Sequence, residues 1–378
     1  MPREREHTFS VGRGEEMKYL DEFRDGDLAA RLVERIHRRP TGPVNLMEVC
    51  GTHTVAVFRH GIRQLLPEQV SMVSGPGCPV CVTANRDIDW AIAFARRPGA
   101  ILATFGDMLK VPGSFSTLQQ ARAEGADVRV VYSTLDALQI AGANSGRPVV
   151  FFGIGFETTA PTIACSILEA ERLGIDNYYV FSVHKVMPPP MRALVASGEI
   201  RIDGFLCPGH VSTIIGSEPY RFLPREYGIP CVISGFEPLD ILQSIDMLLE
   251  MRAEGKADVM IQYRRVVRPE GNRVALEQMY RVFQPADAEW RGLGVIPGSG
   301  LEVREEYARF DARRAFQVDP GPTREHVGCR CGEVLRGVVA PPECVLFGGV
   351  CTPESPVGPC MVSSEGTCST WYLFGGVE

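Results

Sequence analysis

The sequence predicts an α/β protein made of two Rossmann-like parallel-sheet domains plus a smaller mixed domain that is rich in cysteine. Three observations support this fold class. Strand-like apolar runs alternate with helical patterns from residue 44 to residue 256, which is typical of crossover units and parallel sheets. At 378 residues the chain is too long for one ordinary core, so two or three domains are expected. Six of the 12 cysteines lie between Cys329 and Cys368, where periodicity is lost.

The expected elements follow in order along the chain. An N-terminal helical segment, residues 1–43, contains an amphipathic helix over Leu20–Arg38 and is expected to pack on the C-terminal part. The next elements predict a first α/β domain at 44–146, a second at 147–256 and a C-terminal domain at 257–378. Strands are expected at Val44–Val49, Val70–Ser74, Ala100–Thr104, Val128–Tyr132, Val149–Gly153, Tyr178–Ser182, Gly204–Cys207 and Cys231–Ser234. Helices are expected at Asn85–Arg96, Ser133–Asn144, Thr159–Leu173 and Pro238–Arg252.

Composition narrows the class of protein. The net charge of −7 favours neither nucleic acid nor an anionic membrane as a partner. The start of the chain is polar and charged, without the apolar stretch of a signal peptide, and no run is long enough to cross a bilayer. We therefore expect a soluble, cytoplasmic protein, in which cysteines serve metal ligation or thiol chemistry rather than disulfides.

Polar clusters follow many of the expected strands. In open parallel sheets, ligands bind beyond the carboxyl ends of the strands, so we expect one functional cleft lined by these ends, between two similar α/β halves. The clusters are Cys50-Gly-Thr-His53, Gly75-Pro-Gly-Cys78-Pro-Val-Cys81, Phe105-Gly-Asp107, Gly155-Phe-Glu157-Thr-Thr159, His184, Cys207-Pro-Gly-His210 and Gly235-Phe-Glu237.

Three thiols in these clusters are candidates for chemistry. Cys50 ends a strand and His53 follows it, so this thiol is either a metal ligand or activated nucleophile, or a buried cysteine beside a helix start. Cys78 and Cys81 stand at CxxC spacing before a helix, whose N–H groups stabilise thiolates. Glu157 is either a hydrogen-bonding or proton-handling group of the cleft or a simple helix-start carboxylate.

The other histidines and cysteines of this region are expected to be structural. His184 and His210 lie in loops after strands, where a single histidine is more often hydrogen-bonded than a ligand. Cys165 falls in a helix among apolar neighbours, and Cys207 and Cys231 fall on strands, so all three are expected in the core.

The cysteine tail favours an iron–sulfur cluster. Such clusters need four thiolates, and glycine-containing backbone lets N–H groups approach the sulfides. The alternative is a structural Cys₄ zinc site, but zinc sites use paired, closely spaced cysteines, and only Cys329 and Cys331 are close in sequence. We therefore expect residues 257–378 to form an iron–sulfur domain.

With these motifs assembled, the chain resembles the HypD family of hydrogenase maturation factors from about Leu20 to Phe374. In that family two Rossmann-like domains and a cluster-bearing domain surround a central cleft. The matching stretches are Glu48-Val-Cys-Gly-Thr-His-Thr54, Gly75-Pro-Gly-Cys-Pro-Val-Cys81, Thr104-Phe-Gly-Asp107, Gly155-Phe-Glu-Thr-Thr159, Pro208-Gly-His-Val211, Gly235-Phe-Glu-Pro-Leu-Asp240, Trp290-Arg-Gly-Leu-Gly294 and Met361-Val-Ser-Ser-Glu-Gly366.

The resemblance implies an assembly scaffold rather than a free-standing enzyme. With a HypC-type chaperone, such a scaffold holds iron while two cyanides, delivered by a HypE-type partner, and a carbonyl are attached. The Fe(CN)2CO group then passes to the hydrogenase large subunit. By resemblance, Cys50 would be the thiolate on this iron, Cys78 and Cys81 would support iron binding or redox change, and His53 would lie beside them.

The resemblance also assigns the tail. A [4Fe–4S] cluster would be held by Cys331, Cys344, Cys351 and Cys368, with Cys329 as the alternative to Cys331, and Cys329 and Cys360 would form a redox thiol pair near it. Two rival functions stay open: a cluster-dependent thiol–disulfide reductase, and a zinc-stabilised interaction module.

Overall fold

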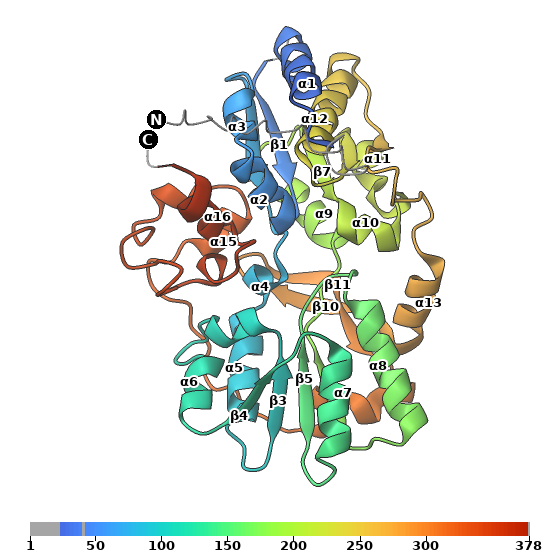
Figure 1. Cartoon of the computed structure of the whole chain (residues 1–378), viewed down its shortest axis with the longest axis vertical. Coiled ribbons are helices and arrows are strands. Elements are labelled where there is room, and N and C mark those ends of the chain that lie inside the picture. The colour runs from blue at the N-terminus through green and yellow to red at the C-terminus, as the bar shows by residue number, and fades with distance from the viewer. Residues whose placement is uncertain (1–22, 40–41, 377–378) are drawn as a thin grey trace, which may run out of the picture.

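The computed structural model describes residues 23–39 and 42–376, and it shows two α/β lobes stacked one above the other (Figure 1). The antiparallel pair β10 (Phe283–Trp290) and β11 (Gly294–Val303) lies between the lobes, together with the short helix α4 (Pro79–Val82). The cysteine-rich tail lies beside the upper lobe, with α16 (Thr367–Phe374) against α2 (Gly51–Arg59). The predicted fold class of two parallel sheets with a smaller cysteine-rich part is confirmed.

The upper lobe contains a five-stranded parallel sheet. Its strand order is β2-β1-β7-β8-β9, which is the 2-1-3-4-5 order of one common doubly wound fold. The strands are β1 (Val44–Glu48), β2 (Val70–Ser74), β7 (Gly204–Pro208), β8 (Cys231–Ser234) and β9 (Val259–Ile261). The helices of this lobe are α1 (Gly26–Arg38), α2, α3 (Ile62–Leu65), α9 (Pro188–Ser197), α10 (Gly209–Ile215), α11 (Phe222–Tyr227) and α12 (Pro238–Ala253).

The lower lobe contains a four-stranded parallel sheet in the order β4-β3-β5-β6. Its strands are β3 (Ile101–Thr104), β4 (Asp127–Val130), β5 (Val149–Gly153) and β6 (Tyr178–Ser182). Its helices include α5 (Asn85–Ala95), α6 (Leu118–Ala123), α7 (Thr134–Ala143), α8 (Ala160–Leu173), α13 (Arg273–Val282) and α14 (Ala312–Ala315). All eight predicted strands are confirmed, because strands covered on both faces carry continuous apolar runs that are easily recognised.

The two sheets do not follow the contiguous ranges 44–146 and 147–256. The chain leaves the upper sheet after β2, builds the whole lower sheet, and returns to the upper sheet at β7. A boundary at residue 146 therefore falls inside the lower sheet, between α7 and β5. Local sequence pattern cannot reveal this, because strand neighbours are chosen by contacts between distant segments.

The start of the chain also differs from expectation. The predicted helix at Leu20–Arg38 begins at Gly26 because the Asp25 side chain caps the N–H groups of residues 27 and 28; residues 20–22 lie outside the described part. The helix α1 packs on α12, within the 147–256 range, rather than on the C-terminal part. Arg35 and Arg39 of this segment form ion pairs with the buried Asp246 of α12.

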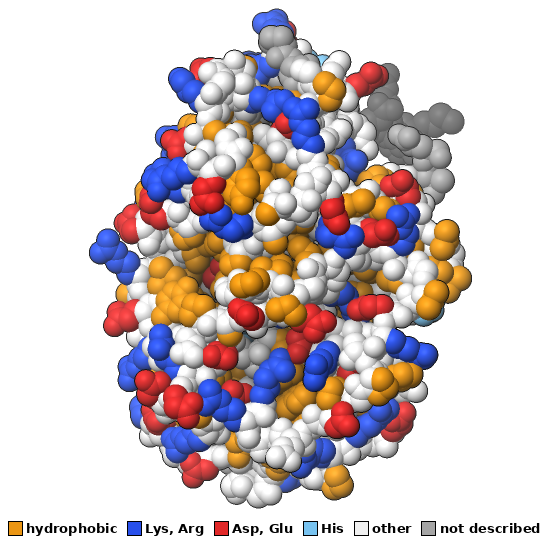
Figure 2. Space-filling view, turned by 180° about the vertical axis from the view of Figure 1, so that it is seen from behind, with side chains coloured by type: hydrophobic (Ala, Val, Ile, Leu, Met, Phe, Trp, Pro, Cys, Tyr) orange, Lys and Arg blue, Asp and Glu red, His pale blue; other side chains and the backbone are white. Residues whose placement is uncertain are grey.

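One hydrophobic core connects the lobes. Met47 and Val49 of the upper sheet belong to the same buried cluster as Phe152 and Phe181 of the lower sheet. Trp290, at the end of β10, lies in this cluster and donates from Nε1 to Ser299 Oγ at 2.8 Å. Viewed from behind, hydrophobic side chains also gather across the middle of the molecule, between the charged surfaces of the two lobes (Figure 2).

The tail has little regular structure. It contains α15 (Cys331–Leu335), α16 and the short 3-10 turns Pro341–Glu343 and Pro359–Met361. Three further 3-10 turns lie at Gly106–Lys110, Glu218–Tyr220 and Glu305–Phe310. No helix in the described ranges has both the length and the apolar character needed to span a membrane.

Candidate functional site

Cys50 lies where β1 passes into α2, as the N-cap residue of that helix, and is 8% exposed. The backbone N–H groups of Thr52 and His53 point at its sulfur. Gly77, from the loop after β2, lies directly against it: a Cβ on Gly77 would stand 2.2 Å from the Cys50 nitrogen. The Gly51 N–H also donates to the Gly77 carbonyl at 3.2 Å. The Cys50 loop and the Gly75–Cys81 loop are therefore in backbone contact.

Glu48 is a functional candidate that the sequence reasoning did not identify. Its carboxyl is 2% exposed and accepts hydrogen bonds from the Cys50 N–H at 3.1 Å and from Thr54 Oγ1 at 2.5 Å. Burial raises the pKa of Glu48 to about 8, despite these hydrogen bonds. This carboxyl therefore holds a proton at neutral pH immediately beneath the Cys50 loop.

The tail supplies a second carboxylate, Glu365. Its Oε1 accepts from Thr52 Oγ1 at 2.7 Å, and its backbone lies so close to Gly51 that a Cβ there would meet the Glu365 oxygen at 2.6 Å. Burial raises the pKa of Cys50 to about 12, with the nearby negative charge of Glu365 as the second cause. Glu365 is in the quoted 361–366 motif, but the sequence reasoning gave it no role.

His53 is fully buried and stacks on Phe236 at 4.6 Å between ring centres. The other imidazole, His210, stacks on Phe236 at 3.9 Å. His53 Nε2 donates to the Gly235 carbonyl at 2.9 Å, while its Nδ1 has no partner. Burial lowers the pKa of His53 to about 4, so the ring is neutral and Nδ1 carries a free lone pair.

The Cys78–Cys81 pair connects the cleft to the tail. Both thiols are buried, and the side chains of Cys360 and Cys78 act on the pKa of the Cys81 thiol. The Cys81 sulfur lies 3.9 Å from the Pro359 carbonyl oxygen. Burial raises the pKa of Cys81 well above its ordinary value, and the Cys360 side chain acts in the opposite direction. The sequence reasoning placed these thiols in one region, and the structure places Cys81 directly against the tail.

The tail cysteines surround a small apolar pocket. Cys329, Cys331, Cys344, Cys351 and Cys368 line it, with Val334, Leu346, Phe347 and Met361 as its apolar walls. Cys360 lies behind the pocket, with its sulfur in contact with those of Cys331 and Cys368. Cys329 contacts Cys331. The turn that holds Cys360 lies against Cys81. The Cys329–Cys360 redox pair stays a prediction.

This pocket meets the requirements of a cluster held by four thiolates. Its walls are apolar, and the Val357 N–H donates to the Cys351 sulfur at 3.3 Å, as N–H groups do around cluster thiolates. Gly358 is packed so tightly that a Cβ there would meet the sulfurs of Cys331 and Cys329 at 2.5 and 2.6 Å. Both of these cysteines line the pocket, so the choice between them stays open.

A single metal ion would need a tighter arrangement. Within residues 23–39 and 42–376, no three His, Cys, Asp or Glu side chains gather around one point at metal-ligand spacing. A four-iron cluster places a separate iron on each thiolate, so its ligands stand further apart than those of one tetrahedral ion. The cysteines gathered in the tail pocket are consistent with binding of a metal or an iron–sulfur group.

Two predicted cleft residues, Glu157 and His184, follow strands of the lower sheet. Glu157 is 2% exposed and accepts from the Met187 N–H, at the start of α9, at 2.9 Å. Burial raises the pKa of Glu157 to about 7. His184 is buried and hydrogen-bonded to Ser182 at 2.9 Å. The strand-end clusters therefore divide into two groups, one on each lobe.

One cysteine expected in the core is on the surface. Cys207 and Cys231 are buried on neighbouring strands and in contact with each other, as expected. Cys165 is exposed, because its position on α8 faces away from the lower sheet, whereas Ile163, Ala164 and Ile167 are buried.

The fold and this site define a class: a two-lobed α/β protein whose cleft thiols adjoin a cysteine-rich tail. The family model described as "Hydrogenase formation hypA family", named HypD, matches residues 27–375, and the chain belongs to this HypD family. It is 50% identical over 368 residues to the hydrogenase maturation factor HypD of Azotobacter vinelandii, covering 95% of this chain and 97% of the relative. It is 44% identical over 366 residues to the HypD of Escherichia coli K12, covering 95% and 98%.

Proposed function

We propose that this protein is a hydrogenase maturation scaffold on which the Fe(CN)2CO group of [NiFe] hydrogenases is assembled. The observation that carries this proposal is the packing of α4, which holds Cys81, against the Pro359–Met361 turn, which holds Cys360, because this packing joins the cleft thiols to the tail. The Cys50 loop adjoins both parts, through Gly77 and through Glu365. The full-length similarity to proteins named hydrogenase maturation factors supports the same function.

In this proposal the iron is the substrate, and Cys50 is its thiolate ligand. Soft thiolates suit an electron-rich iron that carries cyanide and carbonyl. Because burial keeps the Cys50 thiol protonated at neutral pH, iron binding must release that proton. We propose that the N–H groups of Thr52 and His53 steady the sulfur and that the Glu365 carboxylate, which is hydrogen-bonded to Thr52, accepts the proton. Cys78 and Cys81 support iron binding or redox change.

His53 has the hydrogen bonding of an imidazole prepared for a second contact. Its Nε2–H bond to the Gly235 carbonyl fixes the ring orientation and leaves Nδ1 as the lone-pair nitrogen. Metal-binding histidines commonly show this arrangement, with the other ring nitrogen bonded to a backbone carbonyl. We propose that Nδ1 contacts the iron group or a protonated ligand on it.

For the tail we propose a [4Fe–4S] cluster on Cys331, Cys344, Cys351 and Cys368. Such a cluster supplies single electrons when it is bound. The surrounding residues exclude water through Leu346, Phe347 and Met361 and support the thiolates through the Val357 N–H. We propose that Cys360 is the tail cysteine that adjoins the cleft pair, because the Pro359–Met361 turn that holds it packs against α4.

The partners are proposed by family resemblance. A HypC-type chaperone would share the iron with Cys50, a HypE-type protein would deliver cyanide, and the hydrogenase large subunit would receive the product. We also propose that the protein works in the cytoplasm, where thiols stay reduced. Neither nucleic acid nor a membrane is part of this proposal.

The test uses anaerobically purified full-length protein, alone and with a HypC-type chaperone. Mössbauer spectra and sulfide analysis should report a four-iron cluster, and infrared spectra of the complex should show cyanide and carbonyl stretches. Cys50→Ala should lose the infrared bands while keeping the cluster, and the exposed Cys165→Ala should keep both. Absence of both signals in the wild-type complex would refute the scaffold function.

The second candidate is a cluster-dependent thiol–disulfide reductase, which the packing of Cys81 against the turn that holds Cys360 also favours. This function requires Cys81 and Cys360 but does not require Cys50. If Cys50→Ala abolishes hydrogenase maturation and leaves thiol redox behaviour intact, the scaffold is correct; if Cys50→Ala supports full maturation, the reductase is favoured.

A further inference from the structure

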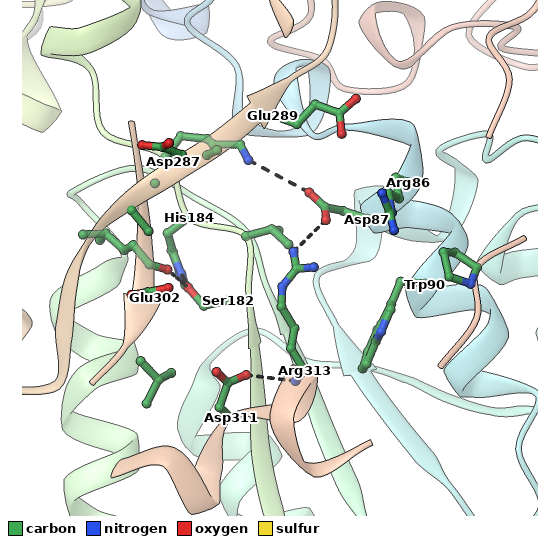
Figure 3. A pocket seen from close by; sticks show the side chains of 18 of the residues that line it. Arg86, Asp87, Trp90, Ser182, His184, Asp287, Glu289, Glu302, Asp311 and Arg313 are labelled. Atoms are coloured by element: carbon green, nitrogen blue, oxygen red, sulfur yellow. Dashed lines mark hydrogen bonds and ion pairs between the residues drawn. The ribbon is translucent and has the colours of Figure 1, made fainter. Parts of the chain in front are cut away.

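A cavity of about 530 Å³ opens in the lower lobe, apart from the thiol site. It lies between the end of β6, the start of α5, the β10–β11 pair and α14 (Figure 3). Its volume is that of an ordinary small-molecule site. Its inner wall carries Asp87 and Lys185, which are 7% and 3% exposed, and Arg313 stands beside them.

Lys185 is held in this wall by its backbone. Its N–H donates to the Gly155 carbonyl at 2.9 Å, and the residue forms a bridge with Gly300 of β11. The neighbouring Val186 N–H bonds to the Ser299 carbonyl at 2.9 Å. The backbone of Lys185 is thus fixed at two points, and its ammonium lies 4.0 Å from the Asp87 carboxylate.

Two cations of this wall, the buried Lys185 and the half-exposed Arg313, lie beside one buried carboxylate, Asp87. Asp87 forms an ion pair with Arg313 at 2.7 Å, and its other oxygen is 4.0 Å from the Lys185 ammonium. That separation is too long for a hydrogen bond. Asp311 is engaged elsewhere, because it caps α14 and pairs with Arg314, and the buried His184 is neutral because burial lowers its pKa to about 3. The Asp87 carboxylate is therefore taken up by Arg313, and the Lys185 ammonium, at 4.0 Å, is left without a hydrogen bond to it.

A buried ammonium without hydrogen-bond partners is costly. An anionic group placed against Lys185 would remove that cost and complete an alternating arrangement of charges. A carboxylate is the natural group, since it accepts from an ammonium and from a guanidinium at once.

The rim of the cavity has the opposite charge. Asp287, Glu289 and Glu302 of the β10–β11 pair are exposed there, against the exposed cations Arg86 and Arg313 (Figure 3). A ligand with several negative charges would be repelled by this rim, whereas a positive group on the ligand would be attracted to it. The inner wall and the rim thus select a ligand with one charge of each sign.

We propose that this cavity binds a small zwitterion of the amino-acid class, with its carboxylate on Lys185 and its amine toward the acidic rim. The site is separate from the thiol cleft and does not depend on the proposed scaffold function. Lys185 is its anchoring residue, and Glu289 sets the preference for a ligand that also carries a positive charge.

Calorimetric titration of the full-length protein tests this with a matched set of four-carbon probes. L-2-aminobutyrate and 4-aminobutyrate carry both charges, butyrate carries only the negative one, and butylamine only the positive one. At least one zwitterion should bind ten or more times more tightly than butyrate and butylamine. Equal binding of butyrate, or no binding of either zwitterion at 20 mM, would overturn the proposal.

Variants assign the effect to the cavity. Lys185→Met should weaken zwitterion binding about 30-fold or more, and Lys185→Arg should restore most of it. Lys110→Met, at an exposed lysine outside the cavity, is the matched control and should bind like wild type. Glu289→Gln should narrow the gap between zwitterion and butyrate by about two- to fivefold. Unchanged binding by a folded Lys185→Met variant, checked by thermal unfolding, would refute the site; if that variant fails to fold, the probe series alone decides.

Discussion

Gly77→Ala is the substitution that most directly tests the geometry around Cys50. A Cβ at residue 77 would stand 2.2 Å from the Cys50 nitrogen, 2.4 Å from its Cα and 2.5 Å from the Val49 carbonyl carbon. All three atoms are backbone, so no side-chain rotation can relieve the clash. Ordinary contact begins at 3.4 Å, so the two loops must separate by about 1.2 Å, the difference between 3.4 and 2.2 Å.

Two magnitudes follow from that displacement. Overpacking of this kind costs about 1–3 kcal/mol, which should lower the melting temperature by several degrees. A shift of about 1 Å in a reacting group lowers activity by roughly 100-fold. Gly77→Ala should therefore remain folded at 25 °C and lose nearly all function that depends on Cys50.

The measurements are thermal unfolding and iron bound per chain after anaerobic loading, with hydrogenase activity in complemented cells as the functional readout. Gly146→Ala is the matched control, because a Cβ at residue 146 meets nothing within 4 Å, and it should behave as wild type. A Gly77→Ala protein with wild-type melting temperature, iron content and maturation activity would show that the two loops do not meet as described.

Three further predictions concern carboxyl groups. Burial raises the pKa of Glu157 from 4.5 to about 7, so the folded protein keeps a proton that the unfolded chain has lost, and wild-type stability falls as pH rises across that window. Glu157→Gln removes this pH-dependent contribution to the free energy of unfolding. The free energy of unfolding of the variant, measured relative to wild type by urea titration, should therefore rise by roughly 3 kcal/mol between pH 4.5 and pH 8. Parallel pH profiles of the two proteins would contradict this. Glu365→Gln should speed alkylation of Cys50 by iodoacetamide at pH 8 severalfold in peptide mass spectra, because the charge of Glu365 helps to raise the pKa of Cys50; an unchanged rate would count against that contact. Asp246→Ala removes the carboxylate that pairs with Arg39 at 2.7 Å. This change should destabilise the packing of α1 on α12 by about 1–3 kcal/mol, and proteolysis before residue 44 should become faster. Equal proteolysis of the variant and the wild type would refute it.

The strands could be predicted because their signal is local. β5 reads Val-Val-Phe-Phe-Gly and is buried at every position, so its apolar run marks a strand covered on both faces. The β10–β11 pair was not predicted, because its signal in the sequence is not local. β10 has buried side chains only at its ends, Phe283 and Trp290, and its place is set by the contacts of Trp290 with the shared core.

The residues of the candidate site also divide into those that the sequence reveals and those that only the structure places. Cys50, Cys78 and Cys81 could be identified from the sequence, because each stands where a predicted strand gives way to a helix start. Glu365 could not be placed by any local pattern: its partner Thr52 is 313 residues away. Cys165 was misplaced because helical apolar neighbours do not tell which side of α8 faces the sheet.

By itself the sequence determined the strands β1 to β8, the helices α1, α5, α7, α8 and α12, and the thiols that follow the strands, since these depend on burial periodicity and residue chemistry within a few positions. Only the tertiary structure decided which strands share a sheet, that Cys81 lies against the turn that holds Cys360, and that the buried Lys185 lines a separate cavity. Those features arise from contacts between distant segments, whose free energy depends on the shape of the whole folded chain rather than on any local stretch of it.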